Sequence, residues 1–256
     1  MTTIARRDFL ALGVAVLLPQ AARNDAPPAG LVDDLVAGNR ILAQEGIVDG
    51  YGHISVRHPG NRERFLLARS VAPELVTAAD IMEFGLDGEP VDARGRTPYK
   101  ERFIHSEVYR ARPDVNAVVH CHTPSLIPFA DSTVTLRPMY HQSAFLAAGV
   151  PVFEIRQAAG MTNMLVETAA LGRALAKSLA DKPAVLMRGH GAVVTADSIL
   201  NVVGRSIYLD LNARIQAQAI ALGGKITYID PEEAKKYAAS DNYSRAWELW
   251  KRKAAK

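Results

Sequence analysis

The sequence predicts an α/β protein in which helices form layers around one central sheet. Apolar residues recur at helical spacing in several segments, and short strand-like runs bounded by glycine, proline or Asp-Gly turns lie between them. The order of these segments is irregular, unlike the strict strand–helix alternation of a parallel βαβ sheet.

The elements follow from local patterns along the chain. A linker at Ala26-Pro27-Pro28-Ala29-Gly30 precedes a helix over 31–44, which Gly46 closes. A helix over 101–111 stops before Pro113, and an amphipathic helix is expected over 163–179. A long helix that Asp197 caps should run to about Leu222, before Gly223-Gly224. Strands are expected over 54–57, 64–68, 81–86, 117–122, 150–155, 184–188 and at 193–194.

Composition excludes several classes of protein. The chain has 256 residues, of which 48% are hydrophobic, so it is neither disordered nor fibrous. Its single cysteine rules out an internal disulfide and a zinc site built on several cysteines. The net charge of +3 comes without a dense basic block flanked by aromatic residues, so no nucleic acid partner is expected.

The N-terminus resembles a twin-arginine export signal. Arg6-Arg7-Asp8-Phe9-Leu10 precedes an apolar run of about ten residues, which is shorter than the ~20 residues that span a bilayer. A buried N-terminal helix is the alternative. We therefore expect three parts, namely an export signal and linker over 1–29, a single domain over 30–245 and a basic tail over 246–256. The mature protein is expected in the periplasm, without a membrane span.

His120-Cys121-His122 is the sharpest local signal for chemistry. In a strand, alternate side chains share a face, so both imidazoles project to one side, about 6 to 7 Å apart along the strand, with Cys121 on the other. Two such imidazoles can share a divalent metal ion if a third ligand is present.

His190 is the candidate third ligand. It lies in Gly189-His190-Gly191 after a predicted buried strand, and its flanking glycines allow a tight turn; a surface turn histidine is the alternative. Glu101 precedes His120 by nineteen residues, at the start of a helix expected beside the strand. The spacing of Glu101 and His105 would also let His105 orient Glu101.

Three segments together resemble the class II aldolase/adducin family. They are the stretch from Glu101 to His122, the segment Gly189-His190-Gly191, and Gly52-His53-Ile54-Ser55 at the family's Gly-Asn-x-Ser position. The resemblance covers roughly residues 30 to 240. It implies a three-layer fold with a central, largely antiparallel sheet between helices. It also implies a divalent metal held by His120, His122 and His190, with Glu101 as fourth ligand or acid/base.

The resemblance implies further partners as well. Sugar-phosphate aldolases of this family are homotetramers with active sites at subunit boundaries, and Tyr140 lies near the position of a catalytic tyrosine that a neighbouring subunit contributes. Tyr140 is therefore a candidate proton donor, with core packing as the alternative. Zinc is the expected metal, while manganese, cobalt and ferrous iron also suit three histidines and a carboxylate.

Departures from the aldolase pattern bear on the substrate. His53 replaces the family's asparagine, Tyr99-Lys100 replaces a serine pair, and Ala68-Arg69-Ser70 begins the segment that replaces a phosphate loop. A phosphorylated sugar is therefore not expected. The candidate substrate-binding residues are instead His53, Ser55, Arg69 and Lys100, whose donors suit a carboxylate or a phenol. For Arg69 and Lys100 surface solvation is the alternative, and for His53 it is a hydrogen bond that stabilises a turn.

These features favour a metal-dependent carbon–carbon lyase acting on a small molecule. The leading hypothesis is decarboxylation of a non-phosphorylated hydroxylated aromatic or hydroxy acid, similar to the dihydroxyphthalate decarboxylase branch of the family. The alternatives are retro-aldol cleavage of a hydroxy-ketone or hydroxy-aldehyde and, outside enzymes, an adducin-like interaction module. The adducin branch is expected to lack the metal-binding histidines, and all three occur here.

Overall fold

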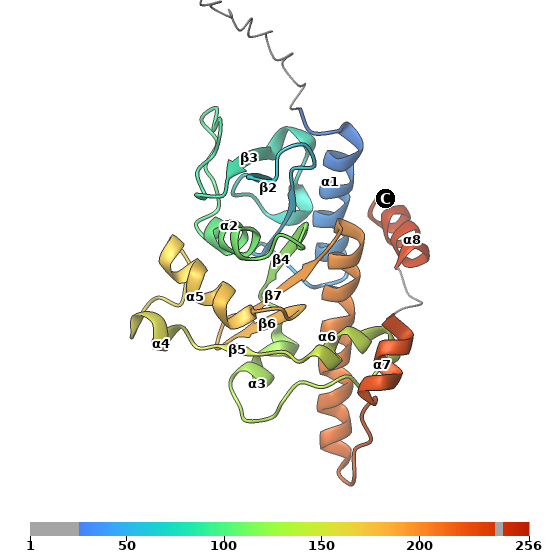
Figure 1. The fold of residues 1–256 in the computed structure, drawn as a ribbon. Helices are drawn as coiled ribbons and strands as arrows, with labels where there is room; N and C mark the ends of the chain where they lie inside the picture. Colours follow the sequence, from blue (N-terminus) through green and yellow to red (C-terminus); the bar gives the residue numbers. More distant parts are fainter. Residues whose placement is uncertain (1–25, 239–242, 256) are drawn as a thin grey trace, which may run out of the picture.

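One seven-stranded sheet organises the computed structural model, which describes residues 26–238 and 243–255 (Figure 1). The strand order is β3-β2-β1-β4-β7-β6-β5, and every neighbouring pair is antiparallel except the parallel pair β5–β6. The strands are β1 (His53–Arg57), β2 (Arg64–Ala68), β3 (Ile81–Gly85), β4 (Ala117–Cys121), β5 (Val152–Phe153), β6 (Ala184–Met187) and β7 (Gly191–Ala196). The predicted α/β class and largely antiparallel sheet are confirmed.

Helices cover both faces of this sheet (Figure 1). They are α1 (Ala29–Gln44), α2 (Arg102–Ala111), α3 (Ile127–Ala130), α4 (Ile155–Ala159), α5 (Ala169–Leu179), α6 (Ile199–Leu222), α7 (Pro231–Ala238) and α8 (Ser244–Ala254). In the described part of the chain, no helix combines the length and the apolar character needed to cross a membrane. The predicted export signal lies outside the described residues.

Strand alternation divides the core into two clusters, one on each face of the sheet. Val119 and Cys121 of β4 belong to the cluster that α1, α6 and α8 cover, and Trp247 and Trp250 of α8 are buried in it. Val118, which directly precedes Val119, belongs to the cluster beneath α2 and α5. His120 therefore faces the α2 side and Cys121 the opposite side, as the alternation predicts.

The register of β1 against β4 places a second histidine beside the first. His53 pairs directly with His120, and Ser55 pairs with Val118. Directly opposed residues of an antiparallel pair point to the same face, so His53 and Ser55 also face α2. Helix α2 in turn carries Glu101 at its N-cap and His105 in its first turns, so the fold brings these five polar side chains, including His120, to one region.

Two helix boundaries differ from the prediction. Ser198, whose side chain accepts a hydrogen bond from the Asn201 amide, caps α6, so the expectation that Asp197 does so is wrong. Helix α5 begins at Ala169 and not near residue 163, because the Thr168 side chain caps it there. The preceding residues 163–168 have no regular structure, and two of them contact the candidate metal site described below.

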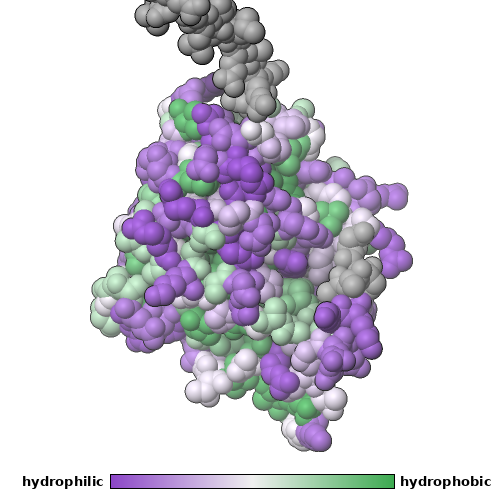
Figure 2. Space-filling model, viewed as in Figure 1, coloured by the Kyte–Doolittle hydropathy of each residue, from purple (hydrophilic) through white to green (hydrophobic). Residues whose placement is uncertain are grey.

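The face of the molecule shown in Figure 2 carries many hydrophilic residues. Figure 2 shows one face, on which hydrophilic residues dominate the upper half and hydrophobic residues are more frequent below. The exposed large hydrophobic residues include Tyr51, Met161 and Leu222. Of these, Tyr51 lines the cavity of the candidate site.

Candidate metal centre

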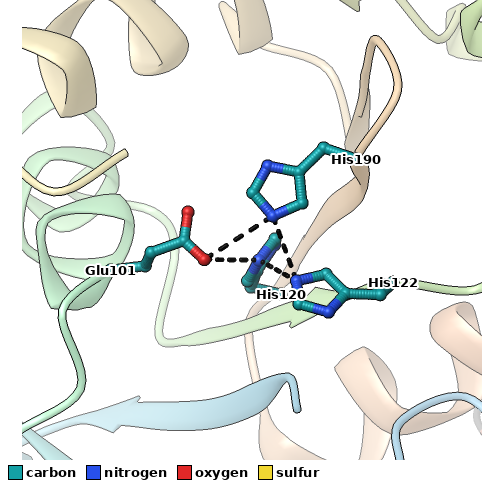
Figure 3. Close-up of side chains that lie close together, drawn as sticks. All are labelled: Glu101, His120, His122 and His190. Atoms are coloured by element: carbon teal, nitrogen blue, oxygen red, sulfur yellow. Dashed lines mark hydrogen bonds and ion pairs between the residues drawn. The ribbon is translucent and has the colours of Figure 1, made fainter. Parts of the chain in front are cut away.

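Four predicted ligands converge at one end of the central strands (Figure 3). Glu101, His120, His122 and His190 each offer one ligand atom, and these atoms all lie within 4.8 Å of one another. The Nε2 atom of His122 lies 3.0 Å from Nε2 of His120 and 3.0 Å from Nε2 of His190. The Glu101 Oε2 atom lies 3.3 Å from His120 Nε2 and 3.6 Å from His190 Nε2.

The local backbone explains why each ligand points inward. His120 lies within β4 and His122 directly after it, so both rings project to the α2 side. His190 sits in the tight β6–β7 turn, where Gly189 has a φ of 63°. A Cβ atom on Gly191 would lie 2.0 Å from the Cys121 carbonyl oxygen, so only glycine allows this close approach of the His190 turn to β4.

Backbone groups orient two of the imidazoles and the carboxylate. His120 Nδ1 lies 3.1 Å from the Ala192 carbonyl oxygen, and His190 Nδ1 lies 3.0 Å from that of Met164. Because a carbonyl only accepts, each Nδ1 carries the proton and each Nε2 presents its lone pair to the cluster. Glu101 Oε1 accepts a hydrogen bond of 2.9 Å from the Val166 amide, which leaves Oε2 facing the imidazoles.

The electrostatics favour a cation at this point. Burial opposes ionisation of Glu101, but the His120 and His190 imidazoles outweigh it and hold the pKa of Glu101 well below its usual range. Burial, together with His120 and His190, lowers the pKa of His122 to about 4. At neutral pH Glu101 is thus a carboxylate, and protonation of His122 is disfavoured.

The donor set fits a divalent metal. Ligands about 2.0–2.1 Å from a tetrahedral zinc ion lie about 3.3 Å from one another, which is close to the separations of 3.0 to 3.6 Å found here. Lone pairs of neutral imidazoles that face one another repel unless a cation lies between them. Among the described residues, this is the one His/Cys/Asp/Glu cluster that meets the geometry for a metal ion.

A cavity of about 420 Å³ opens beside the cluster. His53 and Lys100 line it, and so do the predicted ligands Glu101 and His122. The role of His53 and Lys100 in substrate binding stays a prediction. Tyr51 and Tyr99, which were not predicted as cavity residues, also line the cavity. The Tyr51 ring centroid lies 6.2 Å from that of His122, and Tyr99 packs its ring 4.5 Å from that of His53. Burial raises the pKa of Tyr99 to about 12, so its phenol stays protonated.

The structure does not bring three of the predicted residues to the cavity. Arg69 Nε pairs with Asp80 Oδ1 at 2.5 Å, so its guanidinium is engaged away from the cavity. Ser55 is fully buried, and its hydroxyl bonds to His105 and Tyr109 beneath the cavity. Tyr140 packs against His141 and Tyr208 within this chain. Its predicted role as a proton donor concerns the active site of a neighbouring subunit and stays a prediction.

His105 has a different partner from the one its spacing suggested. Its Nε2 atom lies 2.6 Å from His53 Nδ1, and its Nδ1 atom lies 2.6 Å from Ser55 Oγ. Both ring nitrogens are therefore engaged without Glu101, and the expectation that His105 orients Glu101 is not met. Helical spacing placed the two residues on one face of α2, but β1 supplies the hydrogen-bonding partners of His105.

Comparison with known proteins gives a consistent picture. The family profile of the Class II Aldolase and Adducin N-terminal domain matches residues 33–217. The decarboxylase tropJ of Talaromyces stipitatus is 34% identical over 251 residues, covering 88% of this chain and 94% of that protein. The 3,4-dihydroxyphthalate decarboxylase of Arthrobacter keyseri is 31% identical over 237 residues, covering 86% and 92%.

A solved structure shows the same fold. The L-fuculose 1-phosphate aldolase from Glaciozyma antarctica PI12 superposes with a TM-score of 0.72 at 25% sequence identity, covering 93% of this chain and 91% of that one. Relatives that are decarboxylases and aldolases support a carbon–carbon lyase. On its sequence and its fold, the chain belongs to the class II aldolase and adducin family.

Proposed function

We propose that this protein is a metal-dependent lyase that decarboxylates a hydroxylated aromatic acid or a related non-phosphorylated hydroxy acid. The convergence of one carboxylate and three imidazoles on a common point beside a cavity carries this proposal. The decarboxylase names of relatives at 34% and 31% identity support the choice of reaction.

Glu101, His120, His122 and His190 would hold the metal, with zinc as the expected ion and manganese, cobalt or ferrous iron as others that fit. A divalent ion bound there supplies a Lewis acid that draws electron density from a substrate oxygen. The chain's own residues supply orientation and proton transfer around it.

Glu101 is the proposed proton carrier. Its pKa is held low, so it is ionised at neutral pH, and its Oε2 atom faces the cluster while Oε1 is fixed by Val166. It can accept the proton of a substrate hydroxyl and return it to the ring carbon that loses carbon dioxide. The carbon–carboxylate bond then breaks as a carbon–proton bond forms, and the hydroxyl regains a proton from water.

Lys100 is the proposed partner of a substrate carboxylate. It lines the cavity, it is exposed, and no ion-pair partner for its ammonium occurs among residues 26–238 and 243–255. An anion at this position would gain a charge-assisted contact. The phosphate-loop residues of sugar-phosphate aldolases are absent, which supports a carboxylate over a phosphate.

A parallel assay of two products tests the proposal. Metal-stripped and zinc-, manganese- or cobalt-loaded protein is incubated with hydroxylated benzoates and phthalates, and carbon dioxide release is measured. We expect release that stripping abolishes and metal restores. Aldehyde release from hydroxy-ketones without carbon dioxide release would replace decarboxylation by retro-aldol cleavage. If fully metal-loaded protein releases neither carbon dioxide nor an aldehyde, the proposal of a lyase is contradicted.

Two expectations from the sequence stay predictions. They are export by the twin-arginine route to the periplasm, and a homotetramer whose active sites lie at subunit boundaries. Measurement of molar mass in solution and of the mature N-terminus from cell fractions tests them.

A further inference from the structure

A buried chain of hydrogen bonds runs from the floor of the cavity into the core. His53 Nδ1 lies 2.6 Å from His105 Nε2, His105 Nδ1 lies 2.6 Å from Ser55 Oγ, and Ser55 Oγ lies 2.7 Å from the Tyr109 hydroxyl. Each of the four residues is at most 3% exposed. The chain contains none of the metal ligands, and it begins at a residue that lines the cavity.

The chain has two possible polarities, which differ at its cavity end. In one, Tyr109 donates to Ser55, Ser55 donates to His105, and His105 Nε2–H donates to His53 Nδ1. His53 then carries its own proton on Nε2. In the other, every bond is reversed, and His53 Nε2 is a bare acceptor. Burial lowers the pKa of His105 to about 3, so its imidazole is neutral and carries one proton in either case.

The buried end of the chain selects between the polarities. In the reversed chain Ser55 donates to Tyr109, and the buried phenol proton then needs another acceptor. Among the described residues, this phenol makes no hydrogen bond other than the one with Ser55. The reversed polarity thus leaves a buried phenol proton without an acceptor. The forward polarity places the phenol proton in a hydrogen bond and leaves only His53 Nε2–H, on a residue that lines the cavity, without a partner in the core.

We infer that Tyr109, Ser55 and His105 are positioning residues that fix His53 as the Nε2–H tautomer, a neutral hydrogen-bond donor presented to the cavity. Among the described residues no partner of His53 Nε2 is found. A donor there selects substrates that place an acceptor oxygen, a carboxylate or a phenolate, beside the metal cluster. This last point rests on the proposed function, whereas the tautomer does not.

Nitrogen NMR of the imidazole tests the tautomer directly. Full-length protein labelled with ¹⁵N-histidine is measured at neutral pH in the zinc-loaded and metal-free forms, and His53→Asn identifies the His53 signals. We expect a protonated Nε2 and an unprotonated Nδ1 in His53. The opposite pattern overturns the inference without touching the proposed metal centre or lyase activity.

Substitution of Ser55 tests whether the chain imposes this tautomer. Ser55→Ala removes both bonds of the central hydroxyl, and we expect His53 to become a mixture of tautomers. Ser55→Asp offers only an acceptor to His105 Nδ1, so it should reverse the chain and move the His53 proton to Nδ1. Ser206→Ala is the matched control, because Ser206 is equally buried and bonds to the Val202 carbonyl away from the chain. An unchanged His53 tautomer in folded Ser55→Ala and Ser55→Asp contradicts the inference.

The role of His53 as a hydrogen-bond donor to substrate is tested by enzyme kinetics. His53→Phe keeps a ring but removes the donor, and we expect KM for a hydroxylated benzoate to rise about tenfold with a smaller change in kcat, as for one lost hydrogen bond to a charged group. An unchanged KM would contradict the donor role toward substrate. If no carbon dioxide is released by the wild-type protein, the proposed function fails, and binding of the benzoate measured by calorimetry replaces KM in the same comparison.

Discussion

Two groups of histidines lie side by side on one face of the sheet, and their hydrogen-bonding patterns are opposite. In the candidate metal site, the Nε2 atoms of His120, His122 and His190 face one another. Backbone carbonyls accept hydrogen bonds from the Nδ1–H groups of His120 and His190 on the opposite side of these two rings. In the adjacent hydrogen-bond chain of this protein, donors and acceptors alternate from His53 through His105 and Ser55 to Tyr109.

The ring centroids of His53 and His120 are only 5.2 Å apart, so distance and residue type do not separate the groups. What separates them is the partner of the second ring nitrogen. A carbonyl on Nδ1 leaves a lone pair for a cation, whereas a neighbour that donates on one side leaves a proton to give on the other. Three experiments test this difference between the two groups.

Loss of a ligand should have the largest effect. His122→Ala removes the imidazole that bridges the other two, and we expect loss of bound metal and at least a thousandfold fall in lyase activity. Cys121→Ala, on the opposite face of the same strand, serves as control and should keep its metal. Metal analysis and product release are measured together; full metal content in His122→Ala would contradict the assigned ligand set.

Lower pH should reduce the stability of the folded protein through His105, a member of the second group. The pKa of His105 is about 3 in the folded protein against an ordinary value of 6.5, so the unfolded chain binds one more proton between these values. The free energy of unfolding should therefore fall as pH drops through this window, by about 1.4 kcal/mol per pH unit for this residue. Urea unfolding of metal-free protein should show this slope reduced by that amount in His105→Gln. An equal slope in both proteins would show that His105 does not contribute.

The smallest effect is expected outside both groups. Lys100→Met removes a cavity charge that is exposed to solvent, and we expect about a threefold to tenfold rise in KM for a carboxylate substrate, with metal content unchanged. Lys235→Met on α7, also exposed, is the control. If high salt fails to narrow the difference between Lys100→Met and wild type, the contact is not electrostatic.

The sequence allowed prediction of those parts of the site that depend on local patterns. Strand alternation placed His120 and His122 on one face and Cys121 on the other, and the glycines around His190 indicated its tight turn. These features depend on residues adjacent in sequence, so no tertiary information is needed. The largely antiparallel sheet came from family resemblance, and not from periodicity.

Features that depend on register and packing were not predictable in the same way. The bond between His53 and His105 joins residues 52 positions apart and requires both the β1–β4 register and the docking of α2. Arg69 looked available to a substrate because nothing in its neighbourhood in sequence showed that Asp80 would return to pair with it. The amphipathic pattern also gave α5 an early start, since it cannot reveal that the backbone before Ala169 is used elsewhere.

That backbone segment has a consequence for how the site can change. The Met164 carbonyl lies 3.0 Å from His190 Nδ1, and the Val166 amide donates to Glu101, so two residues of one loop, two positions apart, restrain predicted ligands from two distant elements. Met164 itself adopts a φ of 66°, a conformation that is uncommon for residues other than glycine, so this turn tolerates few changes of its backbone. An insertion or deletion in this loop would therefore displace the Glu101 carboxylate and the His190 imidazole together, although the loop itself contains no predicted ligand.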